Sequence, residues 1–303
     1  MVRDVQFVQN CLMETSTTLP RSADRRFNAD ALAWVAVAAV VGLVGALYAA
    51  VVVDLASEWW TESSASYGML IPPTALYIAY LRRQTTLAFP AERDLRGLWL
   101  VLVACLVFLL GKLAAEFFLT RISLVLLLAG LTWTFWGFAR CRTLAFPFIL
   151  LGTMVPLPAI VYNTAAAPLQ LFASTAATDL AQMLGVSIYR DGNVIQLAST
   201  SLGVEEACSG LHSLSALVVA SLLLGFLEGA TVLGRLLLFA LSVPLAIAVN
   251  VVRVTGTALL ADYRPEWAMG FYHSFSGWLV FVLGFGSLWL LGKLLVRLTR
   301  ANP

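Results

Sequence analysis

The feature that most constrains the fold is a series of long apolar runs separated by short polar segments. A helix needs about 20 apolar residues to cross the hydrocarbon core of a bilayer, and eight segments approach this length. The chain is 60% hydrophobic and 12% charged, whereas soluble domains carry about 25% charged residues. The sequence therefore predicts an all-α polytopic membrane protein with about eight transmembrane helices. The expected spans are residues 31–53, 67–81, 97–115, 122–139, 143–161, 211–227, 236–260 and 275–295.

The distribution of basic residues predicts the orientation. Cytoplasmic loops are enriched in Lys and Arg, and most of the 19 basic residues fall in the N-terminal segment, in alternate loops and near the C-terminus. We therefore expect residues 1–30 to form a cytoplasmic segment, residues 31–295 the membrane domain and residues 296–303 a cytoplasmic tail. Residues 1–30 lack the apolar core of a signal peptide, so the first span is expected to direct the chain to the membrane.

The segments expected outside differ in character. Residues 54–66 carry three carboxylates and are expected to be a loop. Residues 162–207 form the longest extracytoplasmic segment, which begins with an Ala-rich helix expected along the interface or against the bundle. Two β-prone runs flank Asp191-Gly192, which predicts a small β-hairpin. A third β-like piece at 202–204 leads directly to Cys208.

Three polar stretches interrupt the apolar pattern at the predicted outer ends of the last three spans. They are Val204–Ser213, Asn250–Val254 and Tyr272–Gly277. Cys208 precedes the sixth span, Arg253 lies near the outer end of the seventh, and His273 lies at the outer start of the eighth. The topology thus brings a thiol, a guanidinium and an imidazole to the same membrane depth, where they can share one site.

Cys208 has the chemistry of a nucleophile. A thiolate attacks carbonyl carbon, and a helix N-terminus or a nearby cation lowers the pKa of the thiol. The alternative is that Cys208 is a small packing residue, as we expect for Cys105. Position alone favours the packing residue.

Arg253 is the most informative charge in the chain. A charged side chain in a membrane helix costs about 2.5–3.5 kcal/mol on insertion scales, so such residues are candidates for function. Asn250 lies three residues earlier, on the same helix face. An amide and a guanidinium on one face suit a bound carbonyl or oxyanion. The alternative is an arginine that extends to the outer interface.

Two histidines compete for the role of base. Imidazole can accept the thiol proton and return it to a leaving group near neutral pH. His212 lies four residues after Cys208 and is favoured by spacing, whereas His273 can equally be an interfacial side chain. Glu205 and Glu206 fit solvated loop carboxylates, and one of them could orient a histidine or pair with Arg253.

Other classes of site are poorly supported. Two histidines without a His-x-x-x-His pattern supply no metal ligand set, and no glycine-rich phosphate loop occurs. The basic residues form no patch for nucleic acid. The sequence therefore predicts no metal, no cofactor and no nucleic-acid partner.

The three stretches together resemble the exosortase/archaeosortase family of membrane transpeptidases. The resemblance rests on Ala207-Cys208-Ser209-Gly210-Leu211, on Asn250-x-x-Arg253-Val254 and on His273-x-x-x-Gly277, and supporting stretches extend it over residues 55–290. Each motif alone is weak, but the three in this order on an eight-span chain are fairly specific.

The resemblance implies a function and its residues. In that family a Cys, an Arg and a His form the catalytic set, which places these roles on Cys208, Arg253 and His273 and favours His273 over His212. Glu205, Ser209, Gly210, Asn250 and His212 are expected to support the site. The implied activity is cleavage of secreted proteins at a C-terminal sorting signal, with possible transfer to an acceptor. Such a signal has a Pro-Glu-Pro-type motif, a membrane helix and a basic tail.

The resemblance also implies a location and partners. The protein is expected in a bacterial inner membrane, surrounded by lipid, with both termini cytoplasmic and the site facing the periplasm. A separate soluble protein could act as an accessory. The rival functions are a polytopic transporter and a non-catalytic component of an exopolysaccharide export assembly. Transporters have inverted repeats and polar residues near the midplane, whereas here the polar residues gather at one face.

Overall fold

The computed structural model describes residues 21–62, 65–197, 201–203, 211–264, 266 and 271–300. At residues 21–34, 36, 37, 159, 202, 203, 211–213, 271–274, 299 and 300 it describes the backbone alone. The chain divides into two compact units, residues 1–53 and 54–303. The first unit contributes most of helix α2 (Arg21–Thr61). All the contacts below belong to the second unit.

Four of the expected spans are confirmed as helices long and apolar enough to cross a membrane. They lie in α2, α6 (Phe117–Thr143), α10 (Val232–Tyr263) and α12 (Phe271–Arg300). Two further expected spans are the apolar helices α5 (Gly97–Leu113) and α9 (Leu211–Leu227), each of 17 residues. Within the described residues only the first four are both long and apolar enough to span, so the total of eight stays a prediction.

The expected span at 67–81 is broken. A 3-10 turn, η1 (Ser66–Leu70), precedes α3 (Ile71–Leu81), and the short helix α4 (Arg83–Leu87) follows. The pair Pro72-Pro73 occupies the first turn of α3, where a missing N–H removes no helical hydrogen bond. The prolines therefore start a helix here and separate it from η1.

The expected span at 143–161 is broken too. Helix α7 (Ala145–Gly152) has eight residues, and a turn and an extended loop lead to α8 (Ala159–Met183). Pro156 and Pro158 hold this loop extended, because the residue before a proline avoids the helical region. Helix α8 is the Ala-rich helix expected from the sequence. It packs against α10 and the sheet, which settles its place in favour of the bundle.

Helices α5 and α6 form a tightly packed hairpin. The turn between them contains Ala115 with φ 53°. A Cβ at Gly111 would stand 2.7 Å from the Thr120 nitrogen, and one at Gly130 would stand 2.9 Å from the Val101 nitrogen. Real Cβ atoms do not approach backbone this closely, so these glycines allow the contact between the two helices.

We expect Gly111→Val to destabilise the protein by about 1–3 kcal/mol, because overpacking a close helix contact forces the backbones apart. Gly286→Val is the matched control, since nothing lies within 4 Å of a Cβ at Gly286 in α12. Thermal unfolding of both variants in one detergent measures the difference. Equal unfolding temperatures for the two variants would contradict the close α5–α6 contact.

Helix α9 is apolar on two opposite sides. One stripe packs with α3 and α7, and the other packs with α10 and α12. The residues of the two stripes alternate along the helix. The sequence therefore shows a continuous apolar run rather than an amphipathic pattern. The first stripe is Val219, Leu223 and Phe226, and the second is Leu217, Ala220 and Leu224.

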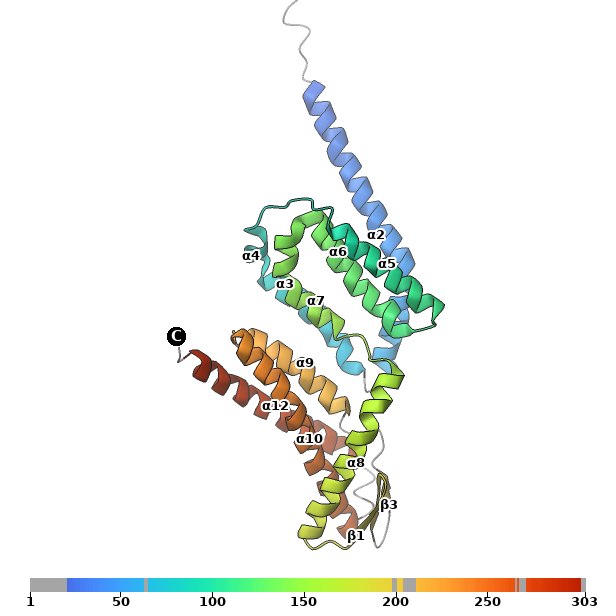
Figure 1. Cartoon of the computed structure of the whole chain (residues 1–303), viewed down its shortest axis with the longest axis vertical. Helices are drawn as coiled ribbons and strands as arrows, with labels where there is room; N and C mark the ends of the chain where they lie inside the picture. The colour runs from blue at the N-terminus through green and yellow to red at the C-terminus, as the bar shows by residue number, and fades with distance from the viewer. Residues whose placement is uncertain are drawn as a thin grey trace, which may run out of the picture. The chain divides into compact units, whose positions relative to one another are not determined.

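The predicted hairpin is confirmed and belongs to a three-stranded antiparallel sheet in the order β1-β2-β3. Strands β1 (Ile188–Asp191) and β2 (Val194–Leu197) are joined by Gly192-Asn193, with Asp191 paired to Val194. Gly192 has φ 61°, which the tight turn requires. Strand β3 (Ser201–Gly203) corresponds to the third β-like piece. The sheet lies beside α8 (Figure 1).

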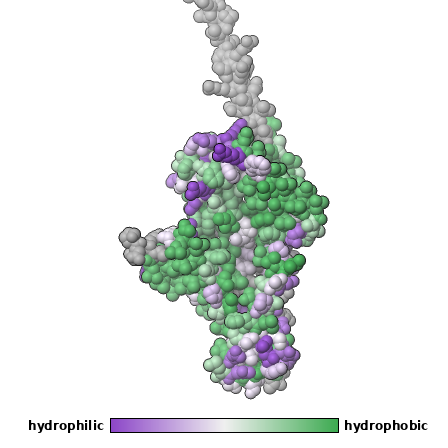
Figure 2. All heavy atoms as spheres, viewed as in Figure 1, coloured by the Kyte–Doolittle hydropathy of each residue, from purple (hydrophilic) through white to green (hydrophobic). Residues whose placement is uncertain are grey.

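Apolar side chains cover most of the helical surface in Figure 2, as a membrane-embedded surface requires. Hydrophilic side chains gather over the sheet end and over the loop after α4. In that loop the Asp94 carboxylate accepts hydrogen bonds from Trp133 Nε1 at 2.8 Å and from the Arg96 backbone nitrogen at 3.0 Å. Both bonds favour the charged form, and the Trp133 bond contributes most to lowering the pKa of Asp94.

Candidate active site

Arg253 lies on the side of α10 that packs against α12. Its Nε donates a hydrogen bond to Ser276 Oγ at 3.4 Å, and Ser276 is only 2% exposed. The guanidinium lies over the backbone of Gly277, because a Cβ there would stand 3.5 Å from Nη2 and 3.7 Å from Cζ of Arg253. The arginine expected to be catalytic is therefore held against a neighbouring helix and does not simply extend to the interface.

Asn250 lies one turn before Arg253 on the same helix. Helix α10 is continuous through both residues, so the spacing of three places them on neighbouring positions of one face. Asn250 is 2% exposed. A buried amide beside a guanidinium gives this end of α10 two polar groups within an otherwise apolar helix.

His273 belongs to the first turns of α12, three residues before Ser276 and four before Gly277. Residues three and four apart lie on one face of an α-helix. The backbone of His273 therefore occupies the face of α12 that contacts Arg253. His212 is the second residue of α9. The side chains of both histidines lie outside the described residues.

Cys208 also lies outside the described residues, together with Glu205, Glu206, Ser209 and Gly210. The described elements on either side of this stretch are linked to α10, β3 through its pairing with β2 and α9 directly. Before it, β3 pairs with β2, whose Ile195 packs in one core with Val254, the residue that follows Arg253. After it, α9 packs on α10 through Leu217 and Leu224. The elements on both sides of the cysteine stretch are thus connected to α10, the helix that carries Arg253.

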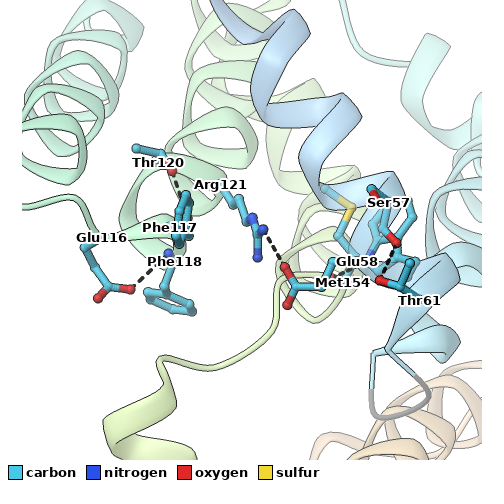
Figure 3. Close-up of polar contacts among 10 residues, drawn as sticks. Ser57, Glu58, Thr61, Glu116, Phe117, Phe118, Thr120, Arg121 and Met154 are labelled. Atoms are coloured by element: carbon cyan, nitrogen blue, oxygen red, sulfur yellow. Dashed lines mark hydrogen bonds and ion pairs between the residues drawn. The ribbon is translucent and has the colours of Figure 1, made fainter.

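A cavity of about 720 Å³ reaches α9 at Ser215, one turn after the helix starts. One wall is the last turns of α2, and another is the first turns of α6 (Figure 3). The loop around Pro156 and Pro158 and the start of α8 complete the lining. The polar lining residues are Asp54, Ser57, Glu58, Thr61, Glu62, Tyr67, Glu116, Arg121, Tyr162, Asn163 and Ser215.

An ion pair joins two walls of the cavity. Arg121 of α6 extends to Glu58 of α2 (Figure 3), and Arg121 is only 7% exposed. A buried guanidinium is tolerated only with such a partner. Glu116 caps α6 by accepting a hydrogen bond from the Phe118 nitrogen at 3.1 Å. Because the lining has four carboxylates and one guanidinium, the cavity is acidic.

Two further contacts tie the cavity walls together. A side-chain hydrogen bond links Tyr67 of η1 to Ser215 of α9. Trp59 Nε1 donates to the Met154 carbonyl at 3.1 Å, which connects α2 to the loop after α7. The start of α9, which follows the cysteine stretch, is therefore fixed from the cavity side as well as from α10.

Sequence reasoning missed this cavity because it treated residues 54–66 as a loop. That expectation is wrong for residues 54–61: helix α2 continues to Thr61. Asp54, Ser57, Glu58, Thr61 and Glu62 then follow the i, i+3, i+4 spacing of a single helix face, which points into the cavity. That spacing of polar residues could have predicted a helix with one polar face at residues 54–62. Nothing local in the sequence identified Arg121 as the partner of Glu58.

Comparison with known proteins agrees with the motifs. The family model described as transmembrane exosortase (Exosortase_EpsH) matches residues 59–290, about three quarters of the chain. The matched region includes α9, α10 and most of α12, and also most of the residues that line the cavity. No curated protein and no solved structure matches the chain.

Proposed function

Because the chain belongs to the transmembrane exosortase family, we propose that it is a membrane-embedded cysteine peptidase and transpeptidase. It cleaves secreted proteins at a C-terminal Pro-Glu-Pro-type sorting signal and can pass the acyl group to an acceptor. Cys208 is the nucleophile, His273 the general base and acid, and Arg253 the oxyanion-stabilising group. The enzyme lies in a bacterial inner membrane with its termini in the cytoplasm and its site facing the periplasm.

The observation that carries the proposal is the contact of Arg253 with Ser276 and Gly277, one turn after His273. It supports a shared site for two residues that are 20 positions apart in sequence. Cys208 is three residues before the start of α9, and three residues of extended chain reach about 10 Å. The packing of α9 and of the sheet on α10 supports a position for Cys208 near the same site.

The residues suggest a mechanism in two halves. The Cys208 thiol gives its proton to His273, and the sulfur attacks the scissile carbonyl carbon. Arg253 stabilises the negative charge that develops on the carbonyl oxygen. The C–N bond then breaks, His273 returns the proton to the leaving amine, and the acyl group remains on sulfur as a thioester. Water, or an acceptor amine or hydroxyl, attacks the thioester, and the released thiolate is reprotonated.

The remaining residues would support these steps. Asn250 can donate its amide N–H to the same carbonyl oxygen as Arg253, since both share one face of α10. Ser209 and Gly210 would shape the turn into α9, and Glu205 would orient His273.

The function is tested with a reporter that carries a secreted domain, a Pro-Glu-Pro motif, a membrane helix and a tagged basic tail. Co-expression with the wild-type enzyme should separate the tail from the secreted domain, and replacement of the motif by three alanines should prevent the cut. An intact reporter after co-expression, across a panel of such signals, would contradict a peptidase and favour a transporter or a non-catalytic export component.

The same assay distinguishes the two histidines. His273→Ala should lower the cleavage rate by about 10²–10⁴-fold, the usual contribution of a general acid–base. His212→Ala, the matched control in the first turn of α9, should retain most of the rate. A larger loss of rate in His212→Ala than in His273→Ala would assign the base to His212, as the spacing from Cys208 alone suggests.

A further inference from the structure

Ser276 is a buried polar residue that the proposed mechanism does not use. It lies on α12 with 2% exposure, between His273 and the apolar remainder of the helix. A buried serine hydroxyl is costly unless it is hydrogen-bonded. Ser276 Oγ accepts a hydrogen bond from Arg253 Nε on α10. The hydroxyl is therefore directed at the one arginine that the proposed mechanism requires.

The bond to Nε matters because of the shape of a guanidinium. The group is planar and its five N–H donors form a rigid fork. Fixing the Nε–H direction, with the Nη2 side facing Gly277, restricts the plane of the whole group. The direction in which the terminal N–H groups point is then set by α12, the helix that also carries His273.

We infer that Ser276 is a positioning residue, which orients the Arg253 guanidinium toward the developing oxyanion through its bond to Nε. This inference rests on the proposed function. Ser276 acts through Arg253 and touches no reacting atom. A Cβ at position 277 would meet the guanidinium at ordinary van der Waals distance, so Gly277 lies directly beside the group that Ser276 orients.

The chain permits a test that separates positioning from simple packing. In Arg253→Lys the methylene Cε replaces Nε, so the residue keeps its positive charge but loses the donor to Ser276. A double-mutant cycle between Ser276→Ala and Arg253→Lys therefore isolates the Nε–Oγ contact. The matched control is Ser242→Ala, a fully buried serine of α10 whose hydroxyl donates to the Phe239 carbonyl of its own helix.

The measurement is the initial rate of reporter cleavage in detergent over a range of reporter concentrations, which gives kcat and KM separately. We expect Ser276→Ala to lower kcat about ten- to hundredfold with KM changed less than twofold, because a misplaced catalytic group costs rate rather than binding. Ser276→Thr keeps the hydroxyl and should recover most of the rate. In the Arg253→Lys background Ser276→Ala should cost less than twofold further, and Ser242→Ala should leave kcat unchanged.

Two outcomes overturn the inference while leaving the function in place. One is an active wild type whose rate is unaffected by Ser276→Ala. The other is an equal loss in the wild-type and Arg253→Lys backgrounds, which would show that Ser276 acts by packing. Unfolding temperatures of all variants exclude a loss of fold as the cause. A wild type that cleaves no reporter contradicts the proposed function itself, so the two failures are distinguishable.

Discussion

Cys208→Ala should abolish processing of the reporter, with a fall in rate of about 10⁴-fold or more, because no other group in the proposed mechanism can form the thioester. The variant should remain in the membrane at the wild-type level, since the change removes a single sulfur atom from the stretch before α9. Immunoblotting of the tagged tail measures the rate. Cleavage by Cys208→Ala at the wild-type rate would contradict the nucleophile assignment.

Cys105→Ala is the matched control for the cysteine. Cys105 lies on α5 and is exposed beside Leu102 and Trp99, on an apolar surface away from the candidate site. Its replacement should leave the rate unchanged. A membrane-impermeant maleimide added outside the cell should label Cys208 and not Cys105, and prior binding of the substrate should protect Cys208. Labelling only after membrane disruption would contradict the predicted orientation.

Arg253→Ala should lower kcat by about 10²–10³-fold, the usual cost of removing one oxyanion donor. KM should change little, because the interaction forms mainly in the transition state. Arg253→Lys should lie between the wild type and the alanine variant, since it keeps the charge and loses the planar fork. Initial rates over a range of reporter concentrations separate the two constants.

Arg190→Ala is the control for a general effect of positive charge. Arg190 lies on β1 in the same extracytoplasmic segment by the predicted topology, and its Nη1 donates to the Gly192 carbonyl at 2.7 Å. Its loss should leave kcat within twofold of the wild type. If Arg253→Ala raised KM and left kcat unchanged, Arg253 would bind the substrate in its ground state and would not stabilise an oxyanion.

Local signals in the sequence predicted the elements that depend on nearby residues. The turn at Gly192 lies beside two β-prone runs, and its conformation requires little help from the rest of the chain. Long apolar runs likewise gave α6, α10 and α12, because the bilayer imposes their length. The prolines at 72 and 156 were visible too, but apolar content alone did not show that they divide their segments.

The candidate site also has features that the sequence predicted and features that it did not. Helix α10 and the start of α12 could be derived from their apolar runs. The side of the membrane on which their ends lie could be predicted from the distribution of basic residues. The contact between Arg253 and Ser276 depends on how two helices pack, which no spacing within one helix encodes. The Glu58–Arg121 pair was hidden for a similar reason: its partners are far apart, and Glu58 was expected in a loop that proved to be helix.

The length of α9 has a consequence for the surrounding lipid. The seventeen described residues of α9, at 1.5 Å each, span about 26 Å, a few ångströms less than a hydrocarbon core of about 30 Å. Such a mismatch is relieved by local thinning of the bilayer beside the helix. A substrate helix of ordinary length that docks there would protrude beyond the thinned layer. If the chain is the cysteine peptidase proposed above, the scissile bond of that helix would then reach water and Cys208 without the helix having to unwind inside the membrane.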